Sequence, residues 1–225
     1  MNNLGHIIST ASRLVRKRGF SLLGKWNQSL QPQELFNIRK GYHHASSAVA
    51  FDDTGNTDEW QKEVYEIALN YMQQEKFHSI IDVGCGSAYK LIHLGNYDTI
   101  GIEVEPTYTW LRQKYPGNKW LLFDEVDPTR LRTDLVICAD VIEHMANPDD
   151  LLHFIQAIQF RTLIISTPER DSVAGKNDYG PPRNTAHYRE WNAQEFKKYL
   201  SDYFTVDQQW ILPGKSVTQV VKCRK

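Results

Sequence analysis

The sequence predicts an α/β protein with a doubly wound sheet of seven strands, mostly parallel and ending in a C-terminal antiparallel hairpin. From residue 58 onward, short apolar runs alternate with segments of helical periodicity. This alternation is typical of parallel strands joined by right-handed crossovers, the arrangement of a Rossmann-like fold. Near the C-terminus, two further apolar runs flank Leu212-Pro213-Gly214-Lys215, a turn sequence that joins antiparallel strands.

The predicted elements follow one another in a regular order along the chain. A helix is expected before the first strand, because Trp60, Val64 and Ala68 recur at helical spacing after the capping residue Asp58. The first strand, residues 79–83, is a short apolar run that leads into glycines, as expected of a buried parallel strand. The remaining strands are predicted at residues 99–102, 119–123, 134–138, 162–166, 204–210 and 216–222.

Length and composition limit the chain to one domain of catalytic size with a small appendage. Its 225 residues, 41% of them hydrophobic, suffice for one sizeable core but not for two. We expect residues 1–57 to form a helical and loop extension that packs on or caps the active site, and residues 58–225 to form the domain itself. A polar insertion within it, residues 167–195, is too long for a simple connection and is expected to be functional.

Net charge and cysteine content limit the classes of partner and the cellular compartment that we expect for the protein. A formal net charge of -1 argues against a nucleic-acid partner. The three cysteines do not read as a disulfide framework, and no apolar run reaches the roughly 18 residues that span a bilayer. A cytoplasmic monomer or homodimer is therefore expected. Residues 7–18 form a basic amphipathic face, which we assign to packing on the domain or on a second subunit in preference to a membrane surface.

A candidate ligand site lies at the end of the first predicted strand. In an open α/β sheet, ligands bind beyond the carboxyl ends of the strands, and there the chain reads Gly84-Cys85-Gly86-Ser87-Ala88. Glycines let the backbone turn sharply and approach a ligand closely. Glu103, at the end of the second strand, is placed to accept both hydroxyls of a ribose. Tyr89 stands where a dinucleotide fingerprint requires a third glycine, which disfavours a ligand with a pyrophosphate.

Four motifs in this order match a known family pattern. They are Asp82-Val-Gly-Cys-Gly-Ser-Ala88, Gly101-Ile-Glu-Val-Glu-Pro106, Asp134-Leu-Val-Ile-Cys-Ala-Asp-Val-Ile-Glu-His-Met145 and Leu163-Ile-Ile-Ser-Thr-Pro168. Over residues 58–223 the chain resembles the class I S-adenosylmethionine-dependent methyltransferases, especially the ubiquinone O-methyltransferase-like branch. Ala88 departs from the pattern, in which a third glycine is usual.

The resemblance implies S-adenosylmethionine as the cofactor and S-adenosylhomocysteine as the product. Carried over position by position, it predicts a cofactor site formed by Asp82, Gly84, Cys85, Gly86, Glu103, Asp124, Ala139 and Asp140. In this site the two glycines would border the methionine part, Glu103 would hold the ribose, and Asp124 would lie near the adenine amino group. Asp140 and the Ala139 carbonyl would lie near the amino end of the cofactor. Cys85 is assigned to loop packing, because the pattern provides no base to activate it as a nucleophile.

The insertion is expected to hold the methyl acceptor. A hydroxyl acceptor needs a base, and we predict His187 for this role in preference to His144. The predicted acceptor contacts are Tyr42, His43, Arg170, Arg183, Tyr188 and Trp191. The arginines would clamp a phosphate or carboxylate and the aromatic residues would stack on a ring, with surface pairing and burial as the respective alternatives. No metal site is expected, because the adjacent side chains of His43 and His44 diverge and no third ligand is spaced to join them.

A softer resemblance concerns the acceptor itself. It rests on the segments Thr167-Pro-Glu-Arg-Asp171, Gly180-Pro-Pro-Arg-Asn184, His187-Tyr-Arg-Glu-Trp191 and Asp52-Asp-Thr-Gly-Asn-Thr-Asp-Glu-Trp-Gln61. These are similar to segments of methyltransferases associated with bacterial surface-glycan assembly. The resemblance makes O-methylation of a sugar hydroxyl, on a nucleotide-linked, lipid-linked or polymeric glycan, the leading prediction. A small-molecule or quinone-type phenol is the second choice, and a nicotinamide-binding oxidoreductase or a non-catalytic cofactor-binding scaffold are the alternatives outside this chemistry.

Overall fold

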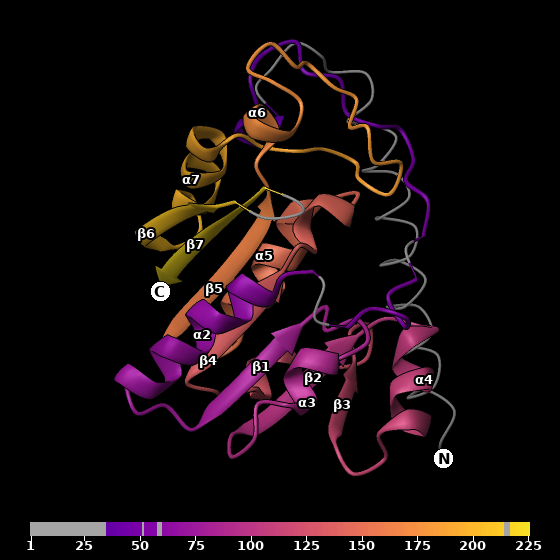
Figure 1. The fold of residues 1–225 in the computed structure, drawn as a ribbon, viewed down its shortest axis with the longest axis vertical. Coiled ribbons are helices and arrows are strands. Elements are labelled where there is room, and N and C mark those ends of the chain that lie inside the picture. Colours follow the sequence, from indigo (N-terminus) through magenta and orange to yellow (C-terminus); the bar gives the residue numbers. More distant parts are fainter. Residues whose placement is uncertain (1–34, 51, 58–59, 214–216) are drawn as a thin grey trace, which may run out of the picture.

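The computed structural model describes residues 35–50, 52–57, 60–213 and 217–225, which form a seven-stranded α/β sheet with helices on both faces (Figure 1). The strand order is β3-β2-β1-β4-β5-β7-β6. Neighbouring strands from β3 to β5 are parallel, whereas β7 runs antiparallel to both β5 and β6. The predicted fold class, with its C-terminal hairpin, is therefore confirmed. The strands are β1 (Ser79–Val83), β2 (Asp98–Glu103), β3 (Lys119–Leu122), β4 (Leu135–Ala139), β5 (Thr162–Pro168), β6 (Thr205–Leu212) and β7 (Thr218–Arg224).

Helices alternate with the strands, as a doubly wound topology requires. The α-helices are α2 (Lys62–Gln74), α3 (Tyr89–Ile92), α4 (Thr107–Lys114), α5 (Pro148–Ala157), α6 (Arg170–Val173) and α7 (Ala193–Ser201). Three short 3-10 helices are η1 (Leu35–Asn37), η2 (Pro128–Arg130) and η3 (Ile142–His144). Within the described ranges, no helix combines the length and the apolar character needed to cross a lipid bilayer.

Alternate residues of the central strands enter two separate hydrophobic cores. Ile81 of β1 packs in one core together with Leu152 of α5. Its neighbour Ile80 packs in the other core, which includes Met72 of α2. The alternation follows from the two-residue period of a strand, whose successive side chains point to opposite faces. Because both faces of the sheet are covered, the ends of the strands are where a ligand reaches the fold.

The described part of the N-terminal extension runs beside the insertion that follows β5 (Figure 1). The His43 N–H donates to the Tyr179 carbonyl (2.7 Å), and the Ala45 N–H donates to the Tyr188 carbonyl (2.8 Å). The Tyr188 N–H in turn donates to the Glu143 carbonyl (2.8 Å) in η3, just after β4. The extension and the insertion thus form one layer, which is tied to the carboxyl end of β4.

The boundaries of the elements correct the prediction in two places. Helix α2 begins at Lys62, so Trp60 precedes it and is 39% exposed instead of lying on the helix. The insertion is only partly a loop, because β5 extends to Pro168 and α6 and α7 lie within or at the end of it. The predicted capping residue Asp58, turn residues 214–215 and the N-terminal helix, including residues 7–18, lie outside the described residues.

Candidate functional site

The loop after β1 requires glycine at two positions. Gly84 has a φ of +77°, and a Cβ atom there would lie 2.5 Å from Val141 Cγ2. Gly86 has a φ of +52°, and a Cβ atom there would lie 2.9 Å from Asp53 Cβ. Both positions combine a left-handed backbone with close packing, so no larger residue fits. Ala88 also has a positive φ of 52°, a conformation that costs alanine about 1–2 kcal/mol and explains the glycine usual in the family pattern.

Glu103, at the end of β2, is bound to this loop. Its Oε2 accepts a hydrogen bond from the Gly86 N–H (2.7 Å), and its Oε1 accepts one from the Val104 N–H (2.8 Å). Burial raises the pKa of Glu103 above its ordinary range, although both backbone donors act in the opposite direction. The structure therefore brings Glu103 and the glycine loop together, as the sequence predicts.

Asp82 lies within β1 and is fully buried. Its Oδ2 accepts a hydrogen bond from the Tyr65 hydroxyl (2.5 Å), whereas its Oδ1 has no partner among the described residues. Burial raises the pKa of Asp82 to about 7, against the opposing effects of Tyr65 and Lys90. An unpaired buried carboxylate oxygen is costly. This atom therefore marks a position where a cationic or N–H group of a ligand would be stabilised.

Asp140 follows the buried Ala139 at the carboxyl end of β4, at the same edge of the sheet. Its φ of 52° is in the left-handed region, which aspartate tolerates better than most residues. Ser166 of β5 holds it there, because the Asp140 N–H donates to the Ser166 carbonyl (3.2 Å) and the Ser166 hydroxyl donates to Asp140 Oδ1 (2.7 Å). Burial raises the pKa of Asp140 to about 6. Asp124 differs from these carboxyl groups, because it is an exposed turn residue after β3.

Residues 52–57 of the N-terminal extension lie against the glycine loop. The Ser87 hydroxyl donates to the Asn56 carbonyl (2.7 Å), and Lys90 Nζ donates to the Thr57 carbonyl (3.0 Å). Asp53 packs on Gly86, and burial raises the pKa of Asp53. No sequence pattern places Asp53 here, because the contact joins segments that are distant along the chain. With it, four carboxyl groups with raised pKa values surround the loop: those of Asp53, Asp82, Glu103 and Asp140.

Two histidines that are distant in the sequence meet beyond the end of β4. The rings of His144 and His187 lie edge to face, with their centroids 4.8 Å apart. His187 Nδ1 is 2.7 Å from Glu190 Oε1, and its Nε2 is 2.9 Å from Asn184 Nδ2. A carboxylate at Nδ1 makes that atom the N–H donor and leaves the lone pair on Nε2. His144 Nδ1 lies 2.9 Å from the Ala186 carbonyl oxygen, and burial lowers the pKa of His144 to about 4.

Glu143 completes this group, which we call the His–Glu cluster: Glu143, His144, His187 and Glu190. Glu143 is fully buried, and its Oε2 accepts a hydrogen bond from the Thr167 hydroxyl (2.9 Å). Its Oε1 has no partner in the part of the chain that the structure describes. Burial, followed by the charge of Asp140, raises the pKa of Glu143 well above its ordinary range. Val141, which directly precedes η3, packs on Gly84 and so places the cluster beside the glycine-loop site.

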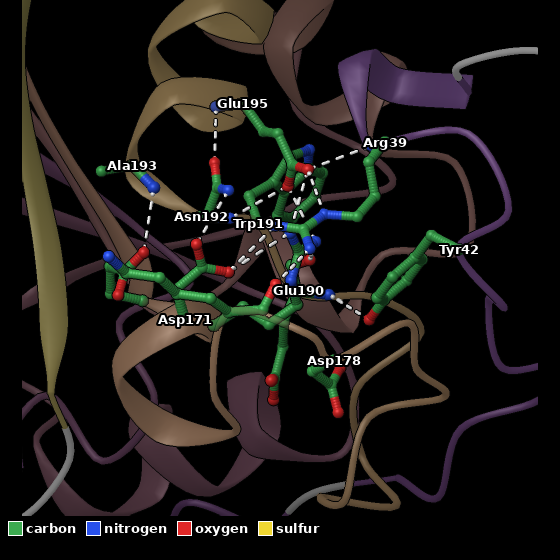
Figure 2. Close-up of polar contacts among 12 residues, drawn as sticks. Arg39, Tyr42, Asp171, Asp178, Glu190, Trp191, Asn192, Ala193 and Glu195 are labelled. Atoms are coloured by element: carbon green, nitrogen blue, oxygen red, sulfur yellow. Dashed lines mark hydrogen bonds and ion pairs between the residues drawn. The ribbon is translucent and has the colours of Figure 1, made fainter.

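Three predicted acceptor residues lie in the interior instead of at the site. Arg170 is fully buried, and its Nη1 and Nη2 donate to the Glu190 carbonyl (3.1 Å) and to Glu195 Oε1 (2.9 Å). Trp191 is fully buried in one of the two cores. Tyr42 is 2% exposed, and its hydroxyl accepts a hydrogen bond from the Glu190 N–H (3.1 Å) (Figure 2). The structure uses the polar atoms and rings of these three residues within the fold, and their acceptor contacts stay predictions.

The interior network around Glu195 joins three segments of the chain. In Figure 2, Arg39 of the N-terminal segment reaches toward Glu195 at the start of α7. Arg39 Nε lies 3.2 Å from Glu195 Oε1, and Arg170 Nη1 lies 2.7 Å from Glu195 Oε2. Asn192 closes a capping box with Glu195, and its amide also donates to Asp171 (3.1 Å). These contacts fix the insertion at the point where α7 begins.

The other predicted acceptor residues remain near the surface. His43 and Arg183 are exposed, and Tyr188 is half-buried. Their proposed contacts with an acceptor stay predictions. Glu143 and Glu190 are site residues that the prediction did not single out. For Glu143 the sequence held one signal, since it directly precedes His144 in the segment that follows a strand.

A hollow of about 550 Å³ lies elsewhere, between α2 and the segment that joins α3 to β2. Phe77, His78 and Tyr97 line part of it, and these residues precede β1 and β2. The hollow therefore opens at the amino ends of the strands, away from the glycine loop. We place the functional site at the carboxyl edge, where the buried ionisable groups converge.

Comparison with known proteins places the chain among methyltransferases. A family model described as a methyltransferase domain matches residues 55–208, whereas no curated protein sequence matches. Among solved structures, the small RNA methyltransferase HEN1 is 21% identical with a TM-score of 0.56, and the match covers 80% of this chain but 27% of that chain.

Two further solved structures match over most of both chains. The magnesium protoporphyrin IX methyltransferase of Synechocystis, with bound S-adenosylhomocysteine, is 17% identical with a TM-score of 0.53, covering 73% of this chain and 83% of that chain. The 1,6-didemethyltoxoflavin-N1-methyltransferase of Burkholderia thailandensis is 22% identical with a TM-score of 0.52, covering 75% and 79%. At these identities the similarity concerns the fold.

Replacing Arg170 by alanine is expected to lower the free energy of unfolding by about 3 kcal/mol. The change leaves the Glu195 carboxylate under the insertion with Arg39 as its remaining ionic partner among the described residues. Urea denaturation followed by circular dichroism measures the effect. Arg183→Ala, at an exposed position of the same insertion, is the control and should change stability by less than about 0.5 kcal/mol. Similar losses in both variants would contradict the structural role of Arg170.

Proposed function

Because the chain belongs to the methyltransferase domain family, we propose that it transfers a methyl group from S-adenosylmethionine to a hydroxyl oxygen of a sugar. S-adenosylmethionine is the cofactor of methyltransferases with this fold, and solved structures of similar fold contain it or its product. The observation that carries the oxygen acceptor is the pair of His187 and Glu190, which is buried beside Asp140.

The residues around the glycine loop fit this cofactor. S-adenosylmethionine carries positive charge on its sulfonium and on its ammonium group, and four carboxyl groups with raised pKa values surround the loop. Asp82 Oδ1, which is buried and unpaired within the described residues, is suited to the ammonium group. Glu103 would exchange its bond from the Gly86 N–H for the ribose hydroxyls. Asp124 and Asp140 would lie near the adenine and the amino end, as the family pattern implies.

The chain's own contribution to the reaction is to position the hydroxyl and to take its proton. When bound, the cofactor supplies a methyl carbon that bonds to the acceptor oxygen as the carbon–sulfur bond breaks, its electron pair remaining on sulfur. The hydroxyl proton must leave, and His187 Nε2 has the lone pair to accept it once the acceptor hydroxyl replaces the exposed Asn184 amide there. Glu190, at Nδ1 of the same ring, stabilises the positive charge that the ring then carries.

His187 is a better candidate for the base than His144. Burial and the neighbouring His187 lower the pKa of His144 to about 4, so its neutral ring binds a proton weakly near neutral pH. His144 Nδ1 faces a backbone carbonyl, which holds the ring but carries no full negative charge. His187 faces the Glu190 carboxylate instead. This difference supports the preference for His187 over His144 as the base.

Two features support a sugar as the acceptor. The segments that resemble surface-glycan methyltransferases lie in the extension and in the insertion, which form one layer at this edge of the sheet. On that layer His43 and Arg183 are exposed and Tyr188 is half-buried. Such groups supply the hydrogen bonds and the flat surface that a sugar ring requires.

Transfer of labelled methyl groups to a panel of acceptors tests the proposal. The purified chain is incubated with methyl-labelled S-adenosylmethionine and with nucleotide sugars, a glycan extract, or phenols and quinols. Label on a sugar oxygen is expected. Label on phenols alone would replace the sugar by a phenol, and absence of transfer despite cofactor binding would favour a scaffold. Tight binding of a nicotinamide dinucleotide without binding of S-adenosylmethionine would establish an oxidoreductase instead.

Cofactor affinity should fall as the pH drops below about 7. Asp82 must be ionised to pair with an ammonium group, and with a pKa of about 7 in the free chain it is protonated at lower pH. Affinity should therefore rise by up to about tenfold per pH unit toward pH 7 and then level off. Isothermal titration calorimetry over this range measures the slope. Asp82→Asn should flatten it, whereas Asp98→Asn, at the exposed amino end of β2, should leave it unchanged.

His187→Ala is expected to lower turnover by about a hundredfold or more, because it removes the group that accepts the proton. Glu190→Gln should lower turnover less and change the pH profile of kcat, since the ring then loses its charged partner. His78→Ala, at the opposite edge of the sheet, is the control. Steady-state kinetics with a reactive acceptor measures all three. Full activity of His187→Ala would assign the role to His144 or to positioning alone.

A further inference from the structure

The His–Glu cluster has the composition and spacing of a metal site. Glu143, His144 and His187 each offer one ligand atom, and these three atoms lie within 4.8 Å of one another. Across the described ranges, this is the one group of three or more His, Cys, Asp or Glu residues so arranged. Two imidazoles and a carboxylate are a recurrent ligand set for divalent transition metals.

Both imidazoles are oriented as metal ligands usually are, with the second ring nitrogen bonded to an oxygen. His144 Nδ1 lies 2.9 Å from the Ala186 carbonyl oxygen. His187 Nδ1 lies 2.7 Å from Glu190 Oε1. These oxygens accept hydrogen bonds, so in the neutral rings the proton resides on Nδ1 and the lone pair on Nε2. In this tautomer the Nε2 atom of each ring carries the lone pair that would coordinate a metal.

Glu143 is the observation that points to a ligand. Its side chain is fully buried, and the Thr167 hydroxyl holds its Oε2 (2.9 Å). Its Oε1 is unpaired within the part of the chain that is described. A buried carboxylate with one unsatisfied oxygen is destabilising, and a cation is the partner that satisfies it best. Packing alone gives no reason for a carboxyl group at this position.

We propose that Glu143, His144 and His187 bind a divalent transition cation such as Mn²⁺, Co²⁺ or Zn²⁺. Ligand atoms about 2.1 Å from a shared ion lie about 3 to 4 Å apart. The three atoms here lie within 4.8 Å of one another, so small side-chain movements would bring them to that spacing. The Asn184 amide, which donates to His187 Nε2 (2.9 Å), must turn away. Asn184 is exposed, so water can replace that contact. The expectation of no metal, argued from His43, does not extend to this cluster.

The cation would act on the acceptor, a consequence that rests on the proposed function. Val141, which directly precedes η3 with Glu143 and His144, packs on Gly84, so the cluster lies beside the expected position of the cofactor. A cation with open coordination positions lowers the pKa of a hydroxyl that it binds. With the cation bound, both imidazoles would be ligands, so His187 could not accept the hydroxyl proton. Solvent would receive it instead, and this step would replace the one assigned to His187 above. Bond formation and cleavage at the methyl carbon are as described above.

Cobalt binding to the purified chain tests the site without cofactor or acceptor. Protein freed of metal by a chelator is titrated with Co²⁺, and binding is followed by visible absorption and calorimetry. One Co²⁺ per chain is expected, and Glu143→Gln and His144→Asn should each weaken binding by about tenfold or more. Asn184→Ala is the matched control, because it removes a neighbour of His187 but no ligand. This variant should bind Co²⁺ at least as tightly as the unmodified chain.

Two results would overturn the metal site. One is the absence of Co²⁺, Mn²⁺ and Zn²⁺ binding at millimolar concentrations. The other is binding that both ligand variants leave unchanged. Thermal unfolding shows whether each variant folds, and His144→Asn decides the matter if Glu143→Gln does not.

Methyl transfer separates this inference from the proposed function. Metal binding without transfer to any acceptor would reject the function and support the site. Transfer at full rate in metal-free protein would reject the catalytic role of the cation and leave the proposed function standing.

Discussion

The arrangement of the site depends on acidic side chains that are buried near the carboxyl ends of the strands. Asp82 and Glu143 are fully buried, and in each one oxygen is held by a single hydroxyl while the other is unpaired among the described residues. Charge in such positions is destabilising unless positive charge or further donors surround it. Under the proposals made above, this positive charge would arrive with ligands: the ammonium and sulfonium groups of S-adenosylmethionine near Asp82, and a cation at Glu143.

The charges of the insertion are used differently. Arg170 is buried as deeply as Asp82, yet it pairs with Glu195 and with the Glu190 carbonyl. This pairing holds the backbone around Glu190, which in turn places the carboxylate that orients His187. In this structure Arg170 therefore fixes the segment that carries Glu190 of the His–Glu cluster. Positioning groups of this kind need rigid support more than exposure.

The sequence predicts the sheet well because its signals are local. The apolar run at 79–83 coincides with β1, and the other runs agree with their strands to within a few residues. The proximity of the glycine loop and Glu103 is predictable for the same reason, because each follows directly from a position at the end of a strand. Whether a polar residue is buried, in contrast, is not determined by its neighbours in the sequence. Whether Arg170 faces solvent or Glu195 depends on how the insertion folds back on α7, and no spacing in the sequence encodes that.

The contact between Asp53 and Gly86, like the burial of Arg170, could not be predicted from the sequence. The contact requires the N-terminal extension to cross the carboxyl edge of the sheet, and no sequence pattern in either segment predicts that the two meet. The convergence of His144 and His187 is an intermediate case. Each is recognisable as a candidate base, but only the fold shows that they share one cluster with Glu143.

The course of the N-terminal extension has a consequence for the catalytic cycle. One continuous stretch contacts the insertion through His43 and Ala45, and contacts the glycine loop through Asn56 and Thr57. Under the proposed function, a displacement of this stretch that let the spent cofactor leave would also alter the cover of the acceptor. If both ligands bind as proposed, occupancy of the two subsites would be thermodynamically linked, and each ligand would influence the affinity of the other by the same factor. The extension would then couple cofactor exchange to acceptor exchange, so that turnover proceeds in a preferred binding order.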